Sequence, residues 1–320
     1  PMKHRHTTAT SKSQAAAWVR ISRCFRLSFI VRLYYRGFFL MLLQLDFTRR
    51  LLPRGACSCI LYSMGVGYMD QEVELLAPAG GIAAFHAAVR GGADAVYLGL
   101  QSFNARRGAD NFTIDTFADA CAFAHLRGVN VYVTLNTAIL PGEVDSAMET
   151  ARQAYRAGAD AFIVQDIGIA SELSRTLPQA RLHISTQMNT HNEAGMLAAA
   201  QLGAARVTLA RELSLPEIEH LAKVGGQLGL EIETFAHGAL CVCYSGQCFM
   251  SSLIGGRSAN RGLCAQACRL PYALHNVAKN KPLPAPGDHL LSPQDLCSID
   301  LLPDLVRAGV ASLKIEGRMK

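Results

Sequence analysis

From residue 72 onward the sequence repeats one unit: a short aliphatic or β-branched run, a polar turn, an alanine-rich helical stretch and then a glycine. Most of the runs are continuous apolar segments without strict alternation, which is typical of parallel strands that are covered on both faces. We expect eight strands, at Glu72–Ala77, Ala95–Leu100, Val131–Asn136, Ala161–Gln165, Leu182–Thr186, Arg206–Ala210, Ile232–Ala236 and Ser312–Ile315.

Glycines precede most of these runs by a few residues, where a helix ending would need a left-handed residue. The motif Gly-Ala-Asp-Ala occurs twice, at 92–95 and 158–161. Strands that alternate with helices through short loops indicate right-handed βαβ units, and eight units favour a closed barrel. No Gly-x-Gly-x-x-Gly follows a strand, which argues against a dinucleotide-binding fold. The predicted class is therefore α/β, a TIM-like (β/α)₈ barrel.

Two features interrupt the pattern. A cysteine-rich insertion, residues 239–289, follows the seventh strand and is much longer than an ordinary βα loop. The sequence also stops at Lys320, directly after the eighth strand and before a closing helix. We therefore interpret the chain as a barrel that is truncated at its C-terminus.

Residues 1–68 differ from the rest in charge. They carry eleven Lys/Arg and one acid, Asp46, whereas residues 69–320 carry 20 Lys/Arg and 24 Asp/Glu. We interpret residues 1–68 as a basic prefix that is disordered or a mis-called start before Met69, with a mitochondrial-type presequence as the alternative. Its longest apolar run is too short to span a membrane, and we expect no membrane partner. If the remainder, 69–320, binds RNA, a local basic patch must do so.

Six cysteines are concentrated between Cys241 and Cys297. In a large chain of this kind, such crowding favours a metal site or catalysis over disulfides and indicates a reducing, cytoplasmic location. The spacings are irregular and wide, which fits an iron–sulfur cluster better than the paired knuckles of structural zinc sites. Zinc remains the alternative, and disulfides come third. Cys121, within a helical pattern, is expected to be an inert buried thiol.

Polar residues follow the predicted strands, and in barrels of this class the active site forms at those ends. The candidates for the site are Asn136, Asp166, Gln187, Arg211, His237 and Glu316. His237 is the candidate for proton transfer. Each of these residues has an alternative role as a loop hydrogen bond or a helix cap.

Three arginines, Arg257, Arg261 and Arg269, lie among the cysteines. They are candidates for neutralising the charge of a cluster or for binding a phosphate or carboxylate. The alternative for each is a solvated loop surface.

The stretch Glu233-Thr-Phe-Ala-His-Gly-Ala-Leu-Cys241, followed by Tyr244-Ser-Gly-Gln-Cys248, resembles the signature of peptidase family U32. Glu74-Leu-Leu-Ala-Pro-Ala-Gly80 and Lys314-Ile-Glu-Gly-Arg318 add to the resemblance, which covers about residues 72–320. It implies an oxygen-independent hydroxylase with a 4Fe–4S cluster that acts on ribosomal RNA, transfer RNA or ubiquinone precursors. For the RNA-modifying members it implies prephenate, a small carboxylate, as the oxygen donor.

Carried over by motif, the resemblance assigns the cluster to Cys241, Cys248, Cys264 and Cys297 and leaves Cys243 and Cys268 spare. The stretch 256–272 is most similar to the branch that hydroxylates ribosomal RNA cytidine. The leading hypothesis is therefore an RNA hydroxylase, in which Arg211 or a loop arginine holds a carboxylate.

Two alternatives remain open. The family name suggests a peptidase, although the sequence has no His-Glu-x-x-His, no Gly-x-Ser-x-Gly and no obvious activated nucleophile. The other alternative is a non-catalytic accessory protein that is stabilised by zinc.

Overall fold

The structure, a computed structural model, describes residues 73–317. The basic prefix at 1–68 and the predicted strand residue Glu72 lie outside the described residues. Within residues 73–317 no helix is both long enough and apolar enough to cross a membrane.

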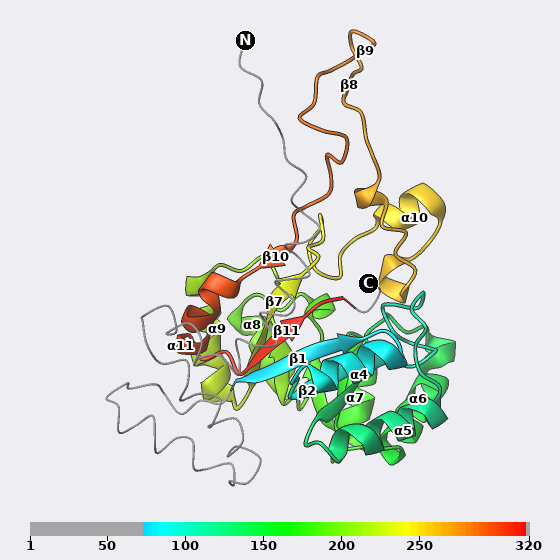
Figure 1. Cartoon of the computed structure of the whole chain (residues 1–320), viewed down its shortest axis with the longest axis vertical. Coiled ribbons are helices and arrows are strands. Elements are labelled where there is room, and N and C mark those ends of the chain that lie inside the picture. Colours follow the sequence, from blue (N-terminus) through cyan, green and yellow to red (C-terminus); the bar gives the residue numbers. More distant parts are fainter. Residues whose placement is uncertain (1–72, 318–320) are drawn as a thin grey trace, which may run out of the picture. The chain divides into compact units, whose positions relative to one another are not determined.

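Eight parallel strands form a closed barrel. They are β1 (Glu74–Ala79), β2 (Ala95–Gly99), β3 (Asn130–Leu135), β4 (Ala161–Val164), β5 (Arg181–Ile184), β6 (Arg206–Thr208), β7 (Glu231–Gly238) and β11 (Ser312–Ile315). Neighbours in the chain pair in order, β6 also pairs with β7, and β11 lies between β7 and β1 (Figure 1). The predicted (β/α)₈ fold is confirmed, with the first strand ending two residues later than expected because its apolar run continues to Ala79.

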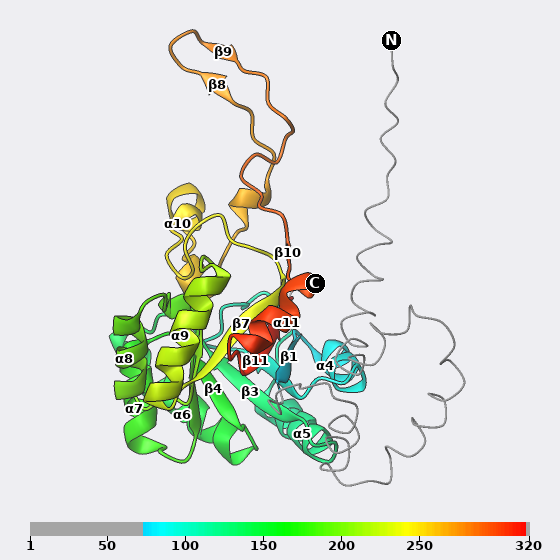
Figure 2. The ribbon, with the colours of Figure 1, turned by 90° about the vertical axis from the view of Figure 1, so that its left-hand side faces the viewer.

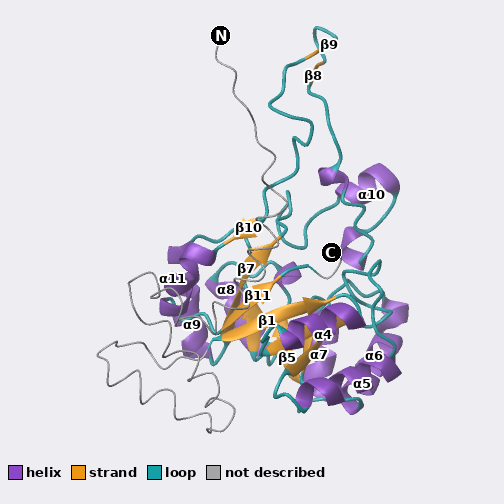
Figure 3. Cartoon of the chain, in the orientation of Figure 1, coloured by secondary structure: helices purple, strands orange, loops and turns teal. Residues whose placement is uncertain are grey.

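Helices cover the outside of the barrel (Figure 3). They are α4 (Ile82–Arg90), α5 (Ile114–His125), α6 (Val144–Arg156), α7 (Ile167–Thr176), α8 (Glu193–Gln201), α9 (Leu215–Leu228) and α11 (Leu302–Arg307). Short 3₁₀ turns lie at Pro141–Glu143, Thr186–Met188, Ala259–Arg261, Ala267–Arg269 and Ile299–Leu301. The ends of α5 and α9 illustrate the local signals: Thr113 caps α5 by accepting from the Thr116 amide, and Gly229 ends α9 in the left-handed conformation.

The interior of the barrel has an apolar and aromatic part and an ionic part. The apolar part includes Leu76, Ala95, Tyr97, Tyr132, Ala161 and Ile163. The ionic part lies toward the N-terminal ends of the strands, where the buried Arg206 pairs with Glu74 and Glu231. Burial alone would raise the pKa of the Glu233 carboxyl, but Lys314 and Arg206 beside it lower that pKa to about 2. The inner wall below the pocket is therefore fixed by paired charges as well as by packing.

The insertion leaves the barrel after β7. It contains α10 (Met250–Gly255) and a hairpin of β8 (His275–Asn276) and β9 (Lys281–Pro282) that projects away from the barrel in both Figure 1 and Figure 2. The chain returns through β10 (Leu296–Cys297), which pairs antiparallel with β7. The return is therefore made by an added strand on the rim of the barrel.

Candidate functional site

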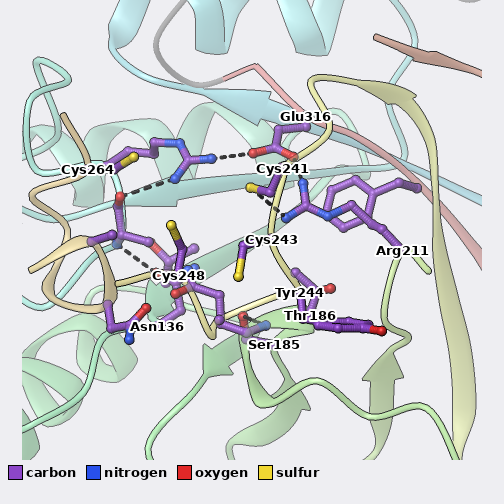
Figure 4. A pocket seen from close by; sticks show the side chains of 18 of the residues that line it. Asn136, Ser185, Thr186, Arg211, Cys241, Cys243, Tyr244, Cys248, Cys264 and Glu316 are labelled. Carbon is purple, nitrogen blue, oxygen red and sulfur yellow. Dashed lines mark hydrogen bonds and ion pairs between the residues drawn. The ribbon is translucent and has the colours of Figure 1, made fainter. Parts of the chain in front are cut away.

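A pocket opens at the C-terminal ends of the barrel strands, where the sequence predicts the site (Figure 4). Ends of several strands and the cysteine insertion line it together. The predicted residues that line it are Asn136, Gln187, Arg211, Glu316, Cys241, Cys248 and Cys264. Asp166, His237 and Cys297 are not among the lining residues.

Glu316 lies between two arginines in this pocket. Its carboxylate accepts hydrogen bonds from Arg106 and from Arg211, whose Nη1 is 2.7 Å from Glu316 Oε2. Arg211 also donates to the Ala239 carbonyl at 3.1 Å and to Cys241 Sγ at 3.4 Å. Because two guanidinium groups share one carboxylate, the three side chains leave a net positive charge beside the first cysteine.

Arg106 also lines the pocket and is not among the residues that the sequence predicts. It lies within the loop between β2 and α5, seven residues after the end of β2, whereas the predicted site residues directly follow their strands. The signal available was the loop itself, Leu100–Thr113, which is longer than most connections in α/β units. Asn136 holds this loop in place, because its buried Oδ1 accepts from the Ala105 amide at 2.9 Å. Asn136 thus positions Arg106.

Both carboxylate oxygens of Asp166 accept hydrogen bonds from the backbone. Its side chain caps α7 by accepting from the Ile169 amide at 3.1 Å, and its other oxygen accepts from the Ile139 amide at 3.0 Å. Both oxygens therefore serve the backbone at the start of a helix. The structure supports the helix-cap alternative for Asp166.

A β-bulge determines where His237 points. Lys314 of β11 is paired with Phe235 of β7, but the next residue, Ile315, is paired with His237, so Ala236 is an extra residue on β7. Paired residues in a sheet share a face, and Ile315 lies on the face opposite Lys314 and Glu316. His237 is therefore on the outer face of β7, whereas strict alternation predicts an inward side chain. His237 is not among the residues that line the pocket, and its role in proton transfer stays a prediction.

Five of the six cysteines between Cys241 and Cys297 line the pocket as free thiols. They are Cys241, Cys243, Cys248, Cys264 and Cys268. Figure 4 shows four of them around one space. Burial raises the pKa of the Cys268 thiol, Arg269 acts in the opposite direction, and the Cys264, Cys241 and Cys248 thiols raise it further. The predicted spare pair, Cys243 and Cys268, thus belongs to the same group of thiols as three of the predicted ligands.

Cys297 is exposed and lies on β10, paired with His237 at the rim of the barrel. It does not line the pocket with the other five. Among residues 73–317, no group of three His, Cys, Asp or Glu side chains is arranged to hold a metal ion.

The loops that carry the cysteines are seated on the barrel by close backbone contacts at two glycines. At Gly246, between Cys243 and Cys248, a Cβ atom would lie 1.9 Å from the carbonyl oxygen of Gln187. At Gly262, before Cys264, a Cβ atom would lie 2.4 Å from the Asn104 carbonyl oxygen. Both glycines also have positive φ, so no other residue fits these contacts without a shift of the loop.

Two of the three loop arginines join segments of the site. Arg269 donates to the Leu240 carbonyl at 2.7 Å, to Ser292 Oγ at 2.6 Å and to the Pro293 carbonyl at 2.7 Å. It thereby connects the segment that leads to Cys241 with the segment that leads to Cys297. Arg261 forms two hydrogen bonds to the Glu143 carboxylate, at 2.7 and 2.8 Å. Both arginines therefore have a structural role, and their predicted binding of a cluster charge, a phosphate or a carboxylate stays a prediction.

Comparison with known proteins identifies the family. The sequence model described as peptidase family U32 matches residues 80–320. The chain belongs to peptidase family U32. This confirms the resemblance that the signature around Cys241 indicates.

Two curated members of the U32 family illustrate its range. The chain is 42% identical over 256 residues to the 23S rRNA 5-hydroxycytidine C2501 synthase of Escherichia coli, covering 78% of this chain and 37% of that protein. It is 36% identical over 260 residues to the tRNA hydroxylation protein P1 of Bacillus subtilis, covering 80% of this chain and 61% of that protein. The chain thus spans between about a third and two thirds of the length of these relatives.

A solved structure of a U32 peptidase shares the fold. It superposes with a TM-score of 0.52 at 12% identity, covering 78% of this chain and 95% of the other. At that identity the likeness concerns the barrel alone.

The thiols of this U32 chain fit an iron–sulfur group by the chemistry of their donors. Thiolates are the ligands that such clusters prefer, and five free thiols share one pocket. Arg211 lies within hydrogen-bonding reach of one of them, and hydrogen bonds to sulfur are among the features by which proteins tune such groups. The described residues therefore offer the donors that such a group needs, although no three of them are arranged as they would be around a bound metal ion.

Proposed function

We propose that this chain carries the catalytic barrel of an oxygen-independent RNA base hydroxylase, with a 4Fe–4S cluster at the mouth of the barrel. The observation that carries the proposal is the convergence of five free thiols and two arginines on one pocket. The two relatives named above, whose names state RNA hydroxylation, support the substrate class. When bound, a cluster of this kind supplies one-electron redox chemistry.

Cys241, Cys248, Cys264 and Cys297 are the proposed ligands, with Cys243 and Cys268 spare. Three of the four line the pocket. Cys297 lies on β10 and is paired with His237, which precedes Cys241 by four residues in the sequence. Single Cys→Ser variants, reconstituted anaerobically and assayed for bound iron, test this set. Loss of iron in the Cys297 variant and retention in the Cys268 variant are expected, and the reverse would transfer the fourth ligand to Cys268.

Arg211 is proposed to hold the carboxylate of the oxygen donor, for which prephenate is the compound that the family resemblance implies. Arg211 and Arg106 already share the single carboxylate of Glu316, so the pocket retains a positive charge that a second carboxylate can neutralise. Asn136 positions Arg106 through the Ala105 amide. The target base must be unpaired or flipped out of a helix to enter the pocket.

Mass spectrometry of RNA from a strain that lacks the gene tests the function. Loss of one hydroxylated nucleoside in ribosomal or transfer RNA is expected, with restoration by the wild-type gene and not by the Cys241→Ser variant. Unchanged hydroxylation of both RNA classes in the deletion strain would refute the proposal. The higher identity with the ribosomal RNA enzyme makes the ribosomal RNA the first to examine.

A peptidase is less well supported by the pocket. A thiol nucleophile needs a general base within hydrogen-bonding reach, and no histidine is among the described residues that line this pocket. Cleavage of denatured collagen by cluster-loaded protein, lost on substituting one cysteine, would favour it.

A zinc-stabilised accessory protein is distinguished from both by metal analysis. Anaerobically purified protein is expected to be brown and to contain iron and sulfide; colourless protein with stoichiometric zinc would favour the accessory role.

A further inference from the structure

The insertion differs from the rest of the chain in charge. Residues 239–289 contain five Lys/Arg and one acid, Asp288, whereas the remainder of 69–320 contains 15 Lys/Arg and 23 Asp/Glu. A cationic lobe is therefore placed on an otherwise acidic barrel, at the end that carries the pocket (Figure 1). Such a local concentration of charge is the electrostatic footprint of a partner with many phosphates.

Most of this cationic charge is available to a partner. Arg257, Lys279 and Lys281 are exposed, and none of the three forms an ion pair with another described residue. Arg269 bonds only to neutral oxygens, so its charge is not cancelled either. Lys279 and Lys281 lie in the turn and second strand of the hairpin that projects from the barrel (Figure 2).

The same lobe exposes aromatic and aliphatic side chains. Of the sixteen large apolar side chains that are exposed in the described part of the chain, ten lie within residues 239–289. Tyr244 is 65% exposed and also lines the pocket, and Phe249 is 59% exposed directly after Cys248. An exposed aromatic ring at a pocket entrance is a surface on which an unpaired base can stack.

We propose that residues 239–289 form the RNA-binding lobe of the protein, which contacts single-stranded RNA. Tyr244 stacks against a base at the entrance of the pocket, and Arg257, Lys279 and Lys281 contact phosphates outside it. The inference rests on the proposed function, because it assumes that the substrate is RNA. A protein partner is the weaker fit, since the exposed apolar side chains are interspersed with cations and with almost no acids.

Two triple variants test the phosphate contacts. The first removes Arg257, Lys279 and Lys281 by substitution with alanine. The matched control removes Arg90, Arg127 and Arg156, which lie in the last turn of α4, just after α5 and in the last turn of α6, and hence at the end of the barrel opposite the pocket. Both variants lose the same charge and retain the same basic prefix, so the contribution of residues 1–68 cancels in the comparison.

The probe is a fluorescein-labelled single-stranded oligoribonucleotide, whose binding is followed by fluorescence anisotropy at several salt concentrations. Each phosphate contact contributes about 0.7 to the slope of log K against log salt for a single strand, so the lobe variant is expected to lower the slope by about 2. The control variant is expected to keep the wild-type slope. Equal effects of the two variants, or no effect of the lobe variant, would overturn the inference and assign the surface to another partner.

Tyr244→Leu and Tyr244→Phe test the stacking separately. Loss of a stacked ring weakens binding of a base by about tenfold, whereas phenylalanine retains the ring. We expect the leucine variant, and not the phenylalanine variant, to bind the single strand more weakly than wild type. We also expect the wild-type protein to bind the same RNA more weakly as a duplex than as a single strand. Wild-type affinity in the leucine variant would refute the stacking contact.

The outcomes separate this inference from the proposed function. Hydroxylation of RNA by a protein whose lobe variants bind RNA normally would refute the lobe and leave the function standing. RNA binding that depends on the lobe, without any hydroxylated product, would refute the proposed function and leave the RNA-binding lobe standing.

Discussion

Replacing Glu233 with glutamine should destabilise the barrel through an unpaired buried charge. The Glu233 carboxylate is fully buried and accepts from Lys314 Nζ at 2.9 Å, from Thr208 Oγ1 at 2.7 Å and from Ser312 Oγ at 3.2 Å. Glutamine fills the same volume but leaves Lys314, which is also buried, without its counter-ion. Breaking a buried ion pair on one side costs about 3 to 5 kcal/mol.

The pKa of Glu233 gives a second route to the magnitude. A carboxyl whose pKa falls from an ordinary 4.5 to about 2 on folding favours the folded state by about 3 kcal/mol at neutral pH. Because the folded pKa is the lower one, this contribution is complete above the ordinary pKa and is lost as the pH falls toward 2. The difference between wild type and Glu233→Gln should therefore be full at pH 7 and much smaller at about pH 3.

Urea unfolding followed by circular dichroism measures both quantities. The control is Glu219→Gln on the surface of α9, where Glu219 pairs with Lys223 in solvent and little or no change is expected. A Glu233→Gln variant that is as stable as wild type at pH 7 would refute the reasoning. So would a difference that stays constant down to about pH 3.

Three further predictions concern single residues. Gly246→Ala should lose bound iron while the barrel stays folded, because its Cβ would collide with the Gln187 carbonyl. The control is Gly255→Ala, whose Cβ meets nothing within 4 Å, and equal iron content in the two variants would contradict this reasoning. Asp166→Ala should lower the free energy of unfolding by about 1 kcal/mol as a lost helix cap and leave the turnover of RNA unchanged, so a large fall in turnover would restore Asp166 as a catalytic residue. Burial raises the pKa of the Cys121 thiol to about 12, so iodoacetamide at pH 8 should label the cysteines of the insertion in the apoprotein but reach Cys121 only on unfolding, as peptide mass spectrometry would show.

The barrel was predictable because each strand is a local apolar run. Buried parallel strands need no partner to be recognised, and glycines such as Gly229 mark helix ends within a few residues of them. The pocket side chains at strand ends, Asn136, Arg211 and Glu316, follow from the same pattern. What the pattern gives is the end of each strand, and therefore the residues nearest the mouth of the barrel.

The remaining features depend on contacts between distant segments. The orientation of His237 is reversed by a bulge that exists only where β7 meets β11, so strict alternation along β7 misplaces the side chain. Arg106 reaches the pocket because Asn136 holds its loop from the next strand. The projecting hairpin has only two residues in each strand, too few for any periodicity to be read.

The position of Glu316 at the end of β11 has a consequence for biosynthesis. All the cysteines of the insertion leave the ribosome before β11, yet Lys314 and Glu316 reach the pocket only when β11 has inserted between β7 and β1. Until then the barrel is open at that seam and Arg211 lacks its carboxylate partner. During synthesis, the thiols are thus exposed to oxidants before the surroundings that organise them exist. Under the proposed function, iron would have to be delivered after the last strand has closed the ring.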